Sequence, residues 1–521
     1  MSENIKNINK DKILNQTSRL IESVENAYNT GKAAHKVEQD IFFELLKMGH
    51  MLLSYLFALY QEDDAGETIE LSDDRKVVKL PKKHKRSYLS IFGEFELFRW
   101  VYGTREGQKI DYIPLDKQLQ LPSSKYSYLL QDWGQSLAVD VPYAEASKII
   151  QRIFSLSFPV SGLERTVLST SDSTHPYFDQ QTTVQPAESA QIVVVSADCK
   201  GVVIRKPGTE KVGSTQEAKP VNIEQTTPKG HFGNKKMAVV GASYCVDPYP
   251  RTPEKVLESL FRSKDKCVTE SAKQPRPKPV NKHVRACMDR DKKDTLQPAR
   301  ETVFSWIGQE IEQRNPGGKN DVVFIMDGEK KLWEMGAKII APNQCIQILD
   351  IIHAASYIWK VTEALSPDSS TKENIPIVKK YMGYLLNGQV KKVIRSVRYL
   401  ATRRKITGKR LDQIIISSGY LENNAHRMHY NEYLAAGYPI GSGIIEGACR
   451  HIIVDRMEES GMRWVMDGAK AMLGLRCIYI NGDWGQFMDF NIQQEQQRIH
   501  PATAKTLKAA NDDVFRQLKV V

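Results

Sequence analysis

The sequence predicts an α/β protein in which helices flank a mixed β-sheet, preceded by a mostly helical region that contains a β-hairpin. Three observations support this prediction. Apolar residues recur at three- and four-residue spacing before residue 62, and they alternate with polar residues around Gly93. After residue 186 the chain alternates buried-type apolar strands with helical stretches, and a long helical segment interrupts this pattern.

Composition limits the class of protein. A chain of 521 residues exceeds one ordinary core, so two to four domains are expected. Lys and Arg outnumber Asp and Glu by 73 to 62, an excess that suggests a polyanionic partner such as nucleic acid. The seven cysteines form no CxxC pair, which favours a reducing compartment over a disulfide framework or a zinc knuckle. The polar start and the absence of a run of roughly 18 apolar residues predict a soluble, intracellular protein.

The N-terminal third offers two candidate surfaces. Residues 13–62 are predicted to be helical, with Gly49 as the only weak point, and to form a core or dimerisation helix. A basic stretch then leads into the hairpin around Gly93, where aromatic side chains interleave with cations. Such a strand pair could follow a phosphate backbone, or it could be a solvated edge hairpin with its aromatics in the core. The predicted DNA contacts here are Lys82, Lys83, Lys85 and Arg86.

Residues 126–170 are predicted to form short helices that break at Val141-Pro142 and at Pro159. Short helices with tight turns are compatible with a helix-turn-helix DNA reader and equally with plain helical packing. Residues 171–190 are rich in Ser, Thr, Gln and Pro, and they mark a predicted domain boundary.

The α/β part begins with an apolar strand that is predicted to end at Asp198, followed by a turn at Lys200-Gly201 and a returning strand. A polar loop is predicted over 207–230, and a third strand follows in "KKMAVVGASYCVD". Residues 251–300 show no clear period and are predicted to be an insert or long loop.

Two strand-helix units come next. "DVVFIMDGEKKLWEMG" is a buried-type strand that ends at Asp327 and leads into a helix. "QCIQILDIIHAASYIWKV" is another, with Asp350 and His353 at the junction. If the first and fourth strands of the sheet are neighbours, Asp198 and Asp327 meet at one edge of the crevice.

Residues 355–435 are predicted to be mainly helical, and one segment within them, "KKVIRSVRYLATRRKITGKR", has no acidic residue. Its apolar residues share one helical face and its cations share another. The missing counter-charge favours phosphate binding, although a charge run can also be a plain solvated face. The predicted DNA contacts in this segment are Lys391, Arg395, Arg398, Arg403 and Arg404.

Glu446 lies early in a helix that follows the glycine-rich turn "YPIGSG". A helix crossing the sheet edge could present it to Asp198 and Asp327 as the third ligand of a divalent-metal site. Two Mg²⁺ ions about 3.5–4 Å apart can stabilise the attacking and leaving oxygens of a phosphoryl displacement, and Mg²⁺ prefers such oxygen ligands.

Each of these residues also has a structural alternative. The two aspartates could cap turns, and Glu446 could pair with Arg450 at i+4. Asp350 and His353 could be a cap and a core histidine.

Cations follow Glu446 along the chain. Arg450 is predicted to offer its forked donors to a phosphate oxygen. Arg456, Arg463 and Trp464 are predicted to contact the DNA backbone, with Trp464 stacking on a flipped or frayed base.

Several motifs together resemble a known family. "SADCKG", "IMDGEKKLW", "ILDIIHAASYIW", "YPIGSGIIEGACRHIIVDRMEESGMRW" and "MLGLRCIYINGDW" are similar to those of bacterial insertion-sequence transposases of the ISKra type, which are DDE transposases with a ribonuclease H-like fold. The resemblance is strongest over 320–490. It implies that Asp198, Asp327 and Glu446 are the catalytic, metal-binding acids. It also implies that Asp350 and His353 form an aspartate-x-x-histidine pair that orients the site.

The resemblance further implies two Mg²⁺ ions, with Mn²⁺ as a substitute, and double-stranded DNA as partner, both as terminal inverted repeats and as target. A cytoplasmic, nucleoid-associated homo-oligomer with no membrane partner is expected, a dimer by default. Two alternatives are a ribonuclease H-like nuclease or resolvase without strand transfer, and a domesticated DNA-binding protein.

The predicted organisation has six parts. They are an N-terminal helical region (1–75), a hairpin and helical DNA-binding region (76–185), the first part of a catalytic core (186–354, with a basic insert at about 251–315), a helical insertion (355–435), the second part of the core (436–490) and a C-terminal tail (491–521).

Overall fold

A computed structural model describes most of the chain. The described residues are 2–61, 65–71, 75–104, 110–181, 192–205, 235–261, 276–292, 295–339, 344–459 and 462–500. The predicted loop over 207–230 lies outside them, as does the predicted C-terminal tail beyond residue 500. The chain forms two compact units, one of Met1–Ser173 with Trp484–Val521 and the other of Thr174–Asp483.

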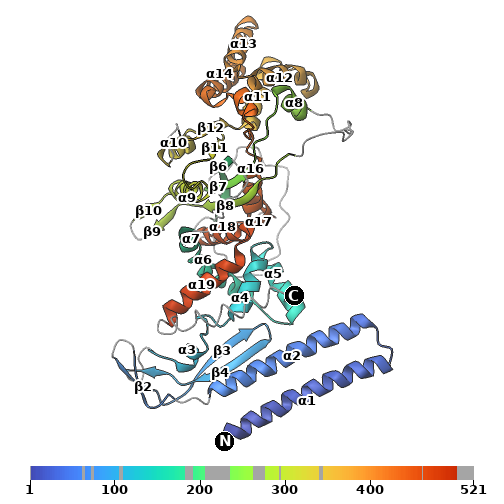
Figure 1. The fold of residues 1–521 in the computed structure, drawn as a ribbon, viewed down its shortest axis with the longest axis vertical. Helices are drawn as coiled ribbons and strands as arrows, with labels where there is room; N and C mark the ends of the chain where they lie inside the picture. The colour runs from blue at the N-terminus through green and yellow to red at the C-terminus, as the bar shows by residue number, and fades with distance from the viewer. Residues whose placement is uncertain are drawn as a thin grey trace, which may run out of the picture. The chain divides into compact units, whose positions relative to one another are not determined.

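The first unit begins with two antiparallel helices, α1 (Ser2–Asn29) and α2 (Ala34–Gln61), which lie side by side in Figure 1. The prediction that residues 13–62 are helical is confirmed for the described residues, with an interruption between Asn29 and Ala34. The connecting turn places Gly31 at φ 62°, a conformation that glycine adopts without steric cost. Helix α2 is also long and apolar enough, by length and composition, to cross a membrane, contrary to the expectation from the sequence; 6% of its most apolar window is buried.

The predicted hairpin is confirmed as β3 (His84–Ser90) and β4 (Gly93–Arg99), with Gly93 at the turn. One face of α2 packs on it, because Phe57 of α2 joins Phe95 and Leu97 of β4 in a small apolar core. Three further strands, β1 (Thr68–Glu70), β2 (Lys76–Lys79) and β5 (Tyr102–Gly103), form a second small sheet, and helix α3 (Pro114–Gln118) follows.

Short helices complete the first unit. The predicted breaks are confirmed, because α4 (Tyr128–Ala138) ends before Pro142, α5 (Tyr143–Phe154) starts after it, and α6 (Val160–Ser171) starts after Pro159. Both prolines occupy N-cap positions, where a missing N–H costs little. The C-terminal helix α19 (Trp484–Ile499) joins α4 through a hydrogen bond of 2.6 Å from Trp484 Nε1 to Asp132 Oδ1.

The second unit is built on a five-stranded mixed sheet with the order β12-β11-β6-β7-β8. Strands β6 (Ile192–Val203), β7 (Lys235–Val246) and β8 (Val280–Cys287) form an antiparallel meander. Strands β11 (Asp321–Met326) and β12 (Ile346–Leu349) continue it in parallel with β6. The α/β class and the adjacency of the first and fourth strands are thus confirmed.

Two details of the predicted sheet are wrong. Strand β6 continues without a break through Lys200 and Gly201, because both residues pair with β7, so Asp198 lies within a strand. The segment predicted as an irregular insert contains β8, and only the second half of that strand is buried, which explains its weak apolar pattern.

Helices α9 (Ala299–Arg314) and α18 (Met466–Asn481) pack on this sheet, with α10 (Lys330–Ile339) against α9 and α7 (Thr174–Gln180) against α18. Helix α8 (Pro253–Leu260) packs on the helical insertion, and a short ribbon of β9 (Arg290–Lys292) and β10 (Thr295–Gln297) precedes α9. Figure 1 shows α9 against the sheet, and α9 contacts both β7 and β8.

The predicted helical insertion is confirmed as α11 (Ile351–Leu365), α12 (Thr371–Leu386), α13 (Val390–Arg403), α14 (Gly408–Asn423) and α15 (Tyr430–Ala435). On α13 the predicted apolar face is turned inward, since Val393 and Val397 are buried, while Lys391 and Arg395 are exposed. The chain then returns to the sheet through α16 (Gly443–Cys449), a π-helical turn (Arg450–Val454) and α17 (Asp455–Met457).

Candidate functional site

Strand register aligns three aspartates at one edge of the sheet. Strands β6 and β11 pair Val195 with Phe324, and β11 and β12 pair Met326 with Leu349. Continuing these registers sets Asp198, Asp327 and Asp350 level with one another on three adjacent strands. Because neighbouring strands lie about 4.8 Å apart, the three carboxylates share one side of this edge.

Local hydrogen bonds fix the direction of each carboxylate. Asp327 Oδ1 accepts the N–H of Glu329 at 3.0 Å, and Asp350 Oδ1 accepts the N–H of Ile352 at 2.9 Å as the N-cap of α11. Asp198 Oδ1 accepts the N–H of Cys199 at 2.7 Å. The capping alternative is therefore correct for Asp350, and Asp327 closes a turn. A capping aspartate uses one carboxylate oxygen for the helix, and its second oxygen can still contact another group, so capping is compatible with a functional role for Asp350.

The glycine-rich turn brings Glu446 to the same place. Ser442, which precedes α16, donates a hydrogen bond of 2.6 Å from Oγ to Asp350 Oδ2. One turn after Glu446, Cys449 donates from Sγ to Asp198 Oδ2 at 3.6 Å. Helix α16 is thus fastened at one end to Asp350 and at the other to Asp198, and it contacts both β6 and β7.

Asp350, His353 and Glu446 form a group that could hold a metal ion. One ligand atom from each lies within 4.8 Å of the other two. Asp350 is buried, His353 is partly buried and Glu446 is exposed, so the group opens to solvent at Glu446. Within the described residues, Asp198 and Asp327 do not belong to this group. The predicted site therefore appears in two parts, and the structure joins Glu446 to the aspartate-histidine pair.

Electrostatics link the two parts. Burial raises the pKa of Asp327 above its usual range, and the negative charge of Asp198 raises it further, while His353 opposes the shift. Burial also raises the pKa of the Cys449 thiol, helped by Asp198, so Cys449 remains a neutral donor to that carboxylate. The carboxylate of Asp327 thus interacts electrostatically with both Asp198 and His353.

Across the described ranges, none of Asp198, Asp327, Asp350 and Glu446 forms an ion pair with a lysine or arginine. Arg300 pairs with Glu329, two residues beyond Asp327 in sequence, at 2.7 Å. Carboxylates that lie close together without a lysine or arginine partner repel one another, and a bound cation would relieve that repulsion.

An aromatic wall lies behind Asp327, and sequence reasoning missed it. Trp333 Nε1 donates to the carbonyl oxygen of Asp327 at 2.6 Å, and the N–H of Gly328 donates to the Tyr420 hydroxyl at 3.0 Å. Tyr420 stacks on Tyr357 with ring centroids 3.7 Å apart. In the sequence Trp333 lies close to Asp327 within "IMDGEKKLW", whereas Tyr420 comes from α14, far along the chain.

The predicted partner of Glu446 lies elsewhere. Arg450 Nε contacts Asp455 Oδ1 at 3.4 Å, and His451 Nδ1 contacts Asp455 Oδ2 at 2.9 Å. The Arg450 side chain is 73% exposed. It therefore remains available to an external anion, and it does not neutralise Glu446.

The prediction of DNA contact is wrong for Arg456 and Trp464, whose side chains are buried, and Arg86 is partly buried and already paired within the protein. Arg456 is 1% exposed and its guanidinium lies 5.1 Å from the centre of the Trp464 ring. Trp464 is 8% exposed and donates from Nε1 to the carbonyl oxygen of Met457. Arg86 pairs with Asp116 at 2.7 Å and donates to the carbonyl oxygen of Ser124. All three hold the fold together.

The other predicted DNA contacts are at the surface: Lys82, Lys83, Lys85, Lys391, Arg395, Arg398, Arg403, Arg404 and Arg463 are exposed. Some already have partners. Lys85 pairs with Glu96, Arg398 pairs with Glu422 at 2.5 Å, and Arg404 donates to the carbonyl oxygen of Leu365 at 2.7 Å. The counter-charge that the α13 segment lacks is therefore supplied in part by α14.

No protein-family model matches the chain, and no curated protein matches it significantly.

Proposed function

We propose that the protein is a DNA transposase that cleaves and joins strands by metal-dependent phosphoryl transfer, with the ribonuclease H-like fold that its motifs resemble. One observation carries the proposal. Asp198, Asp327 and Asp350 are level in register on three parallel strands, and α16 adds Glu446 beside Asp350. The sheet order, with the first strand between the second and the fourth, supports the same fold.

The side chains present fit a divalent cation. Glu446 is exposed beside a buried carboxylate, and neither of them forms an ion pair with a lysine or arginine in the described part of the chain. Carboxylate oxygens suit Mg²⁺ and Mn²⁺, so Asp198, Asp327, Asp350 and Glu446 are the residues that would hold such ions. When bound, a pair of ions would stabilise the attacking and leaving oxygens of the scissile phosphodiester.

The protein's own residues prepare the site. The backbone hydrogen bonds to Asp327 and Asp350 aim their carboxylates before any DNA arrives. His353 lies near Glu446 and also lowers the pKa of Asp327, so its imidazole acts between the two parts of the site as a positioning residue. The exposed guanidinium of Arg450, one helical turn after Glu446, would contact a phosphate oxygen.

The exposed cations of α13 provide the second element of the proposal. Lys391, Arg395 and Arg403 project from the face opposite the buried Val393 and Val397. A row of cations on one helical face is suited to sequence-independent contact with a phosphate backbone.

Incubation with labelled DNA tests the proposal directly. The substrate carries the sequences that flank the protein's own coding region, and Mg²⁺ or Mn²⁺ is added. We expect cleavage at the element ends followed by joining to target DNA. Asp327→Ala should abolish both while leaving DNA affinity equal or slightly higher, because removing a carboxylate near phosphate relieves repulsion.

Asp321→Asn is the matched control, because Asp321 lies at the opposite end of the same strand and is exposed. It should leave cleavage unchanged. Full strand transfer by Asp327→Ala would refute the catalytic assignment. Cleavage without joining by the unmodified protein would indicate a nuclease, and binding without cleavage would indicate a DNA-binding protein.

A further inference from the structure

A cavity of the second unit lies where the end of β7 meets the glycine-rich turn that precedes α16, and we name it the β7 cavity. Its volume is about 420 Å³, within the range of about 300–1,000 Å³ that is typical of small-molecule sites. Its polar and charged lining residues are Tyr244, Asp247, Tyr249, Arg251, Arg276 and Lys278. Glycines and a proline of the turn complete the lining.

Three cations but only one carboxylate line the β7 cavity. Two of the cations belong to the segment 276–279, in which Pro277 and Pro279 are partly buried whereas Arg276 and Lys278 are exposed. Among the described residues, neither Arg276 nor Lys278 forms an ion pair, and the carboxylate of Asp247 is also unpaired. This excess of unpaired positive charge favours an anionic ligand.

Backbone carbonyls hold the third cation, Arg251, in place. Its Nε donates to the carbonyl oxygen of Tyr249 at 3.2 Å, and a terminal nitrogen donates to the carbonyl oxygen of Tyr438 at 2.7 Å. Both acceptors are neutral, so the guanidinium keeps its charge uncompensated. Burial lowers the pKa of Arg251, and the charge of Arg276 lowers it further, so the two guanidinium groups repel each other. An anion bound by both would relieve that repulsion.

Tyr244 adds an unused hydrogen-bond donor. Its side chain belongs to the apolar core between the sheet and the helical insertion and is 4% exposed. Its hydroxyl has no hydrogen-bond partner among the described residues, and such a group requires a partner from solvent or from a ligand. Burial raises the pKa of Tyr244, and the nearby charge of Arg276 opposes the shift. The hydroxyl therefore remains a neutral donor close to that cation.

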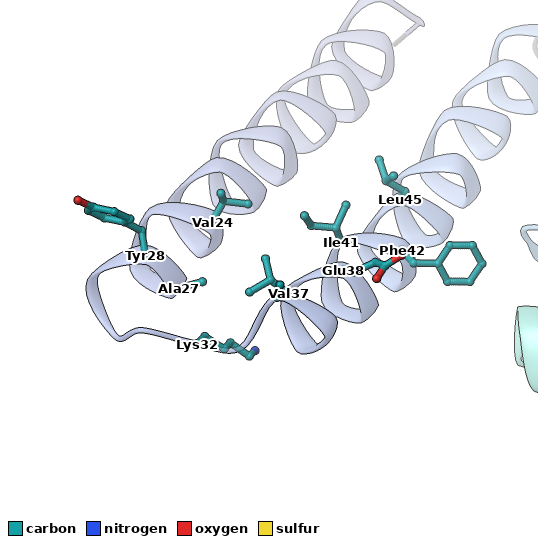
Figure 2. A pocket seen from close by; sticks show the side chains of 10 residues that line it. Val24, Ala27, Tyr28, Lys32, Val37, Glu38, Ile41, Phe42 and Leu45 are labelled. Carbon is teal, nitrogen blue, oxygen red and sulfur yellow. The ribbon is translucent and has the colours of Figure 1, made fainter. Parts of the chain in front are cut away.

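A larger hollow in the first unit lacks these features. Figure 2 shows this hollow of about 580 Å³ between α1 and α2, with the apolar side chains of Val24, Val37 and Ile41. The one cation among its lining residues, Lys32, already pairs with Asp40. Unpaired cations and an unused buried donor occur together in the β7 cavity and not in this hollow.

We propose that the β7 cavity binds a phosphate monoester attached to a planar, apolar group, which is the chemistry of a mononucleotide. A phosphate monoester carries about two negative charges at neutral pH, and the forked donors of Arg251 and Arg276 suit its oxygens. Tyr244 would donate to the same phosphate. The cavity is larger than a phosphate group alone, and the ring of Tyr249 and the side chain of Ile444 offer apolar surface to the attached group. A free nucleotide and the 5′ end of a DNA strand both carry this chemistry.

A ligand in the β7 cavity would also contact the turn that positions α16. Gly441 and Gly443 line the cavity, and Ser442 between them donates to Asp350 Oδ2 at 2.6 Å. An added Cβ at Gly441 would lie 3.8 Å from Asp350 Oδ1, so the turn lies against that carboxylate. The ligand would therefore restrain the segment that delivers Glu446. This consequence rests on the proposed metal site, whereas binding to the cavity does not.

Calorimetric titration of the full-length protein, without DNA or divalent ions, tests the binding. Adenosine monophosphate should bind, and adenosine, which lacks the phosphate, should bind at least ~10-fold more weakly. Tyr244→Phe keeps the core ring and removes only the hydroxyl, so it should weaken adenosine monophosphate binding ~10-fold. Arg276→Gln, at an exposed position that the fold should tolerate, should weaken it by ~10-fold or more. Lys236→Gln is the matched control, because Lys236 is an exposed cation at the opposite end of β7, and it should leave the affinity unchanged.

Hydrogen exchange locates the bound ligand, and competition identifies its source. Saturating adenosine monophosphate should slow amide exchange in 244–251 and 437–444, and binding without this protection would overturn the inference. Three other results would also overturn it: no binding of any nucleotide, binding that Tyr244→Phe and Arg276→Gln both leave unchanged, or equal affinity for inorganic phosphate. Displacement of adenosine monophosphate by a 5′-phosphorylated oligonucleotide, but not by its unphosphorylated form, would support a DNA end as the ligand. Absence of displacement would support a free nucleotide.

Discussion

Replacing Gly328 by alanine should disturb the candidate site, because the added methyl group has no room beside Tyr420. An added Cβ would lie 2.3 Å from Cε2 and 2.6 Å from Cζ of Tyr420. The Tyr420 ring cannot move away easily, since it stacks on the Tyr357 ring with centroids 3.7 Å apart. The strand end that carries Asp327 must therefore move away from α14.

The cost follows from two contributions. Overpacking of a well-packed site costs about 1–3 kcal/mol. Separation of the Gly328 N–H from the Tyr420 hydroxyl, now 3.0 Å apart, adds about 0.5–1.5 kcal/mol. We therefore expect Gly328→Ala to lower the free energy of unfolding of the second unit by ~2–4 kcal/mol. Metal-dependent cleavage should fall with it, because Asp327 is the preceding residue.

Denaturant unfolding followed by tryptophan fluorescence measures the effect, and Gly419→Ala is the matched control. Gly419 immediately precedes Tyr420, and an added Cβ there meets nothing within 4 Å. That variant should be neutral or up to about 1 kcal/mol more stable, as expected for Gly to Ala within a helix. In a Gly328→Ala background, Tyr420→Leu should recover part of the loss by removing the ring. If Gly328→Ala and Gly419→Ala were equally stable, the contact between β11 and α14 would not exist.

Four other predictions concern charge. Burial and the charge of Asp198 raise the pKa of Asp327, so its contribution to the free energy of unfolding is fully present below its unfolded-state pKa and is lost as pH rises through its folded-state pKa. Without divalent ions, Asp327→Asn should therefore become increasingly more stable than the unmodified protein from pH 4 to pH 7. A stability difference that stays constant over this range would contradict the raised pKa. Asp116→Ala should lower the free energy of unfolding by ~3–5 kcal/mol, because Arg86 and Arg99 both pair with this buried carboxylate. If this variant instead lost DNA binding without losing stability, Arg86 would be a DNA-contact residue after all. Replacing Lys391, Arg395 and Arg403 together by alanine should reduce the slope of log affinity against log salt by about 2–3, and an unchanged slope would exclude α13 from the DNA contact. Calorimetric titration should detect divalent-ion binding that Glu446→Gln weakens more than Asp455→Asn does; equal effects would remove Glu446 from the metal site.

The strand β11 could be predicted from the sequence because it is a short apolar run followed at once by an aspartate. The run "VVFIMD" makes β11 buried on both faces and delivers Asp327 to the strand end. The same logic placed Asp350 after β12. It failed at Asp198, since the pair Lys200-Gly201 suggested a turn that the long antiparallel pairing of β6 with β7 overrides.

The local sequence could not predict which of the proposed DNA-contact cations are paired or buried within the protein. Arg86 is neutralised by Asp116, thirty residues away, and Arg398 of α13 is neutralised by Glu422 of α14. Arg456 is buried because Trp464 folds back over it. For Arg86 and Arg398 the partner is 30 and 24 residues away, so a cation that has no partner within twenty residues of sequence can still be paired in the fold.

The division of the acidic residues into two parts follows from their secondary structure. Asp198 and Asp327 extend from strands and are held by the sheet, whereas Glu446 extends from a helix that only crosses its edge. Asp350 belongs to both, because it follows β12, caps α11 and accepts the Ser442 hydroxyl that precedes α16. Asp350 is also the one member of the four that is fully buried. A residue that fixes the helix to the sheet controls the distance between Glu446 and the two strand aspartates. Asp350 therefore determines the geometry of the site even if a metal ion contacts only the other three.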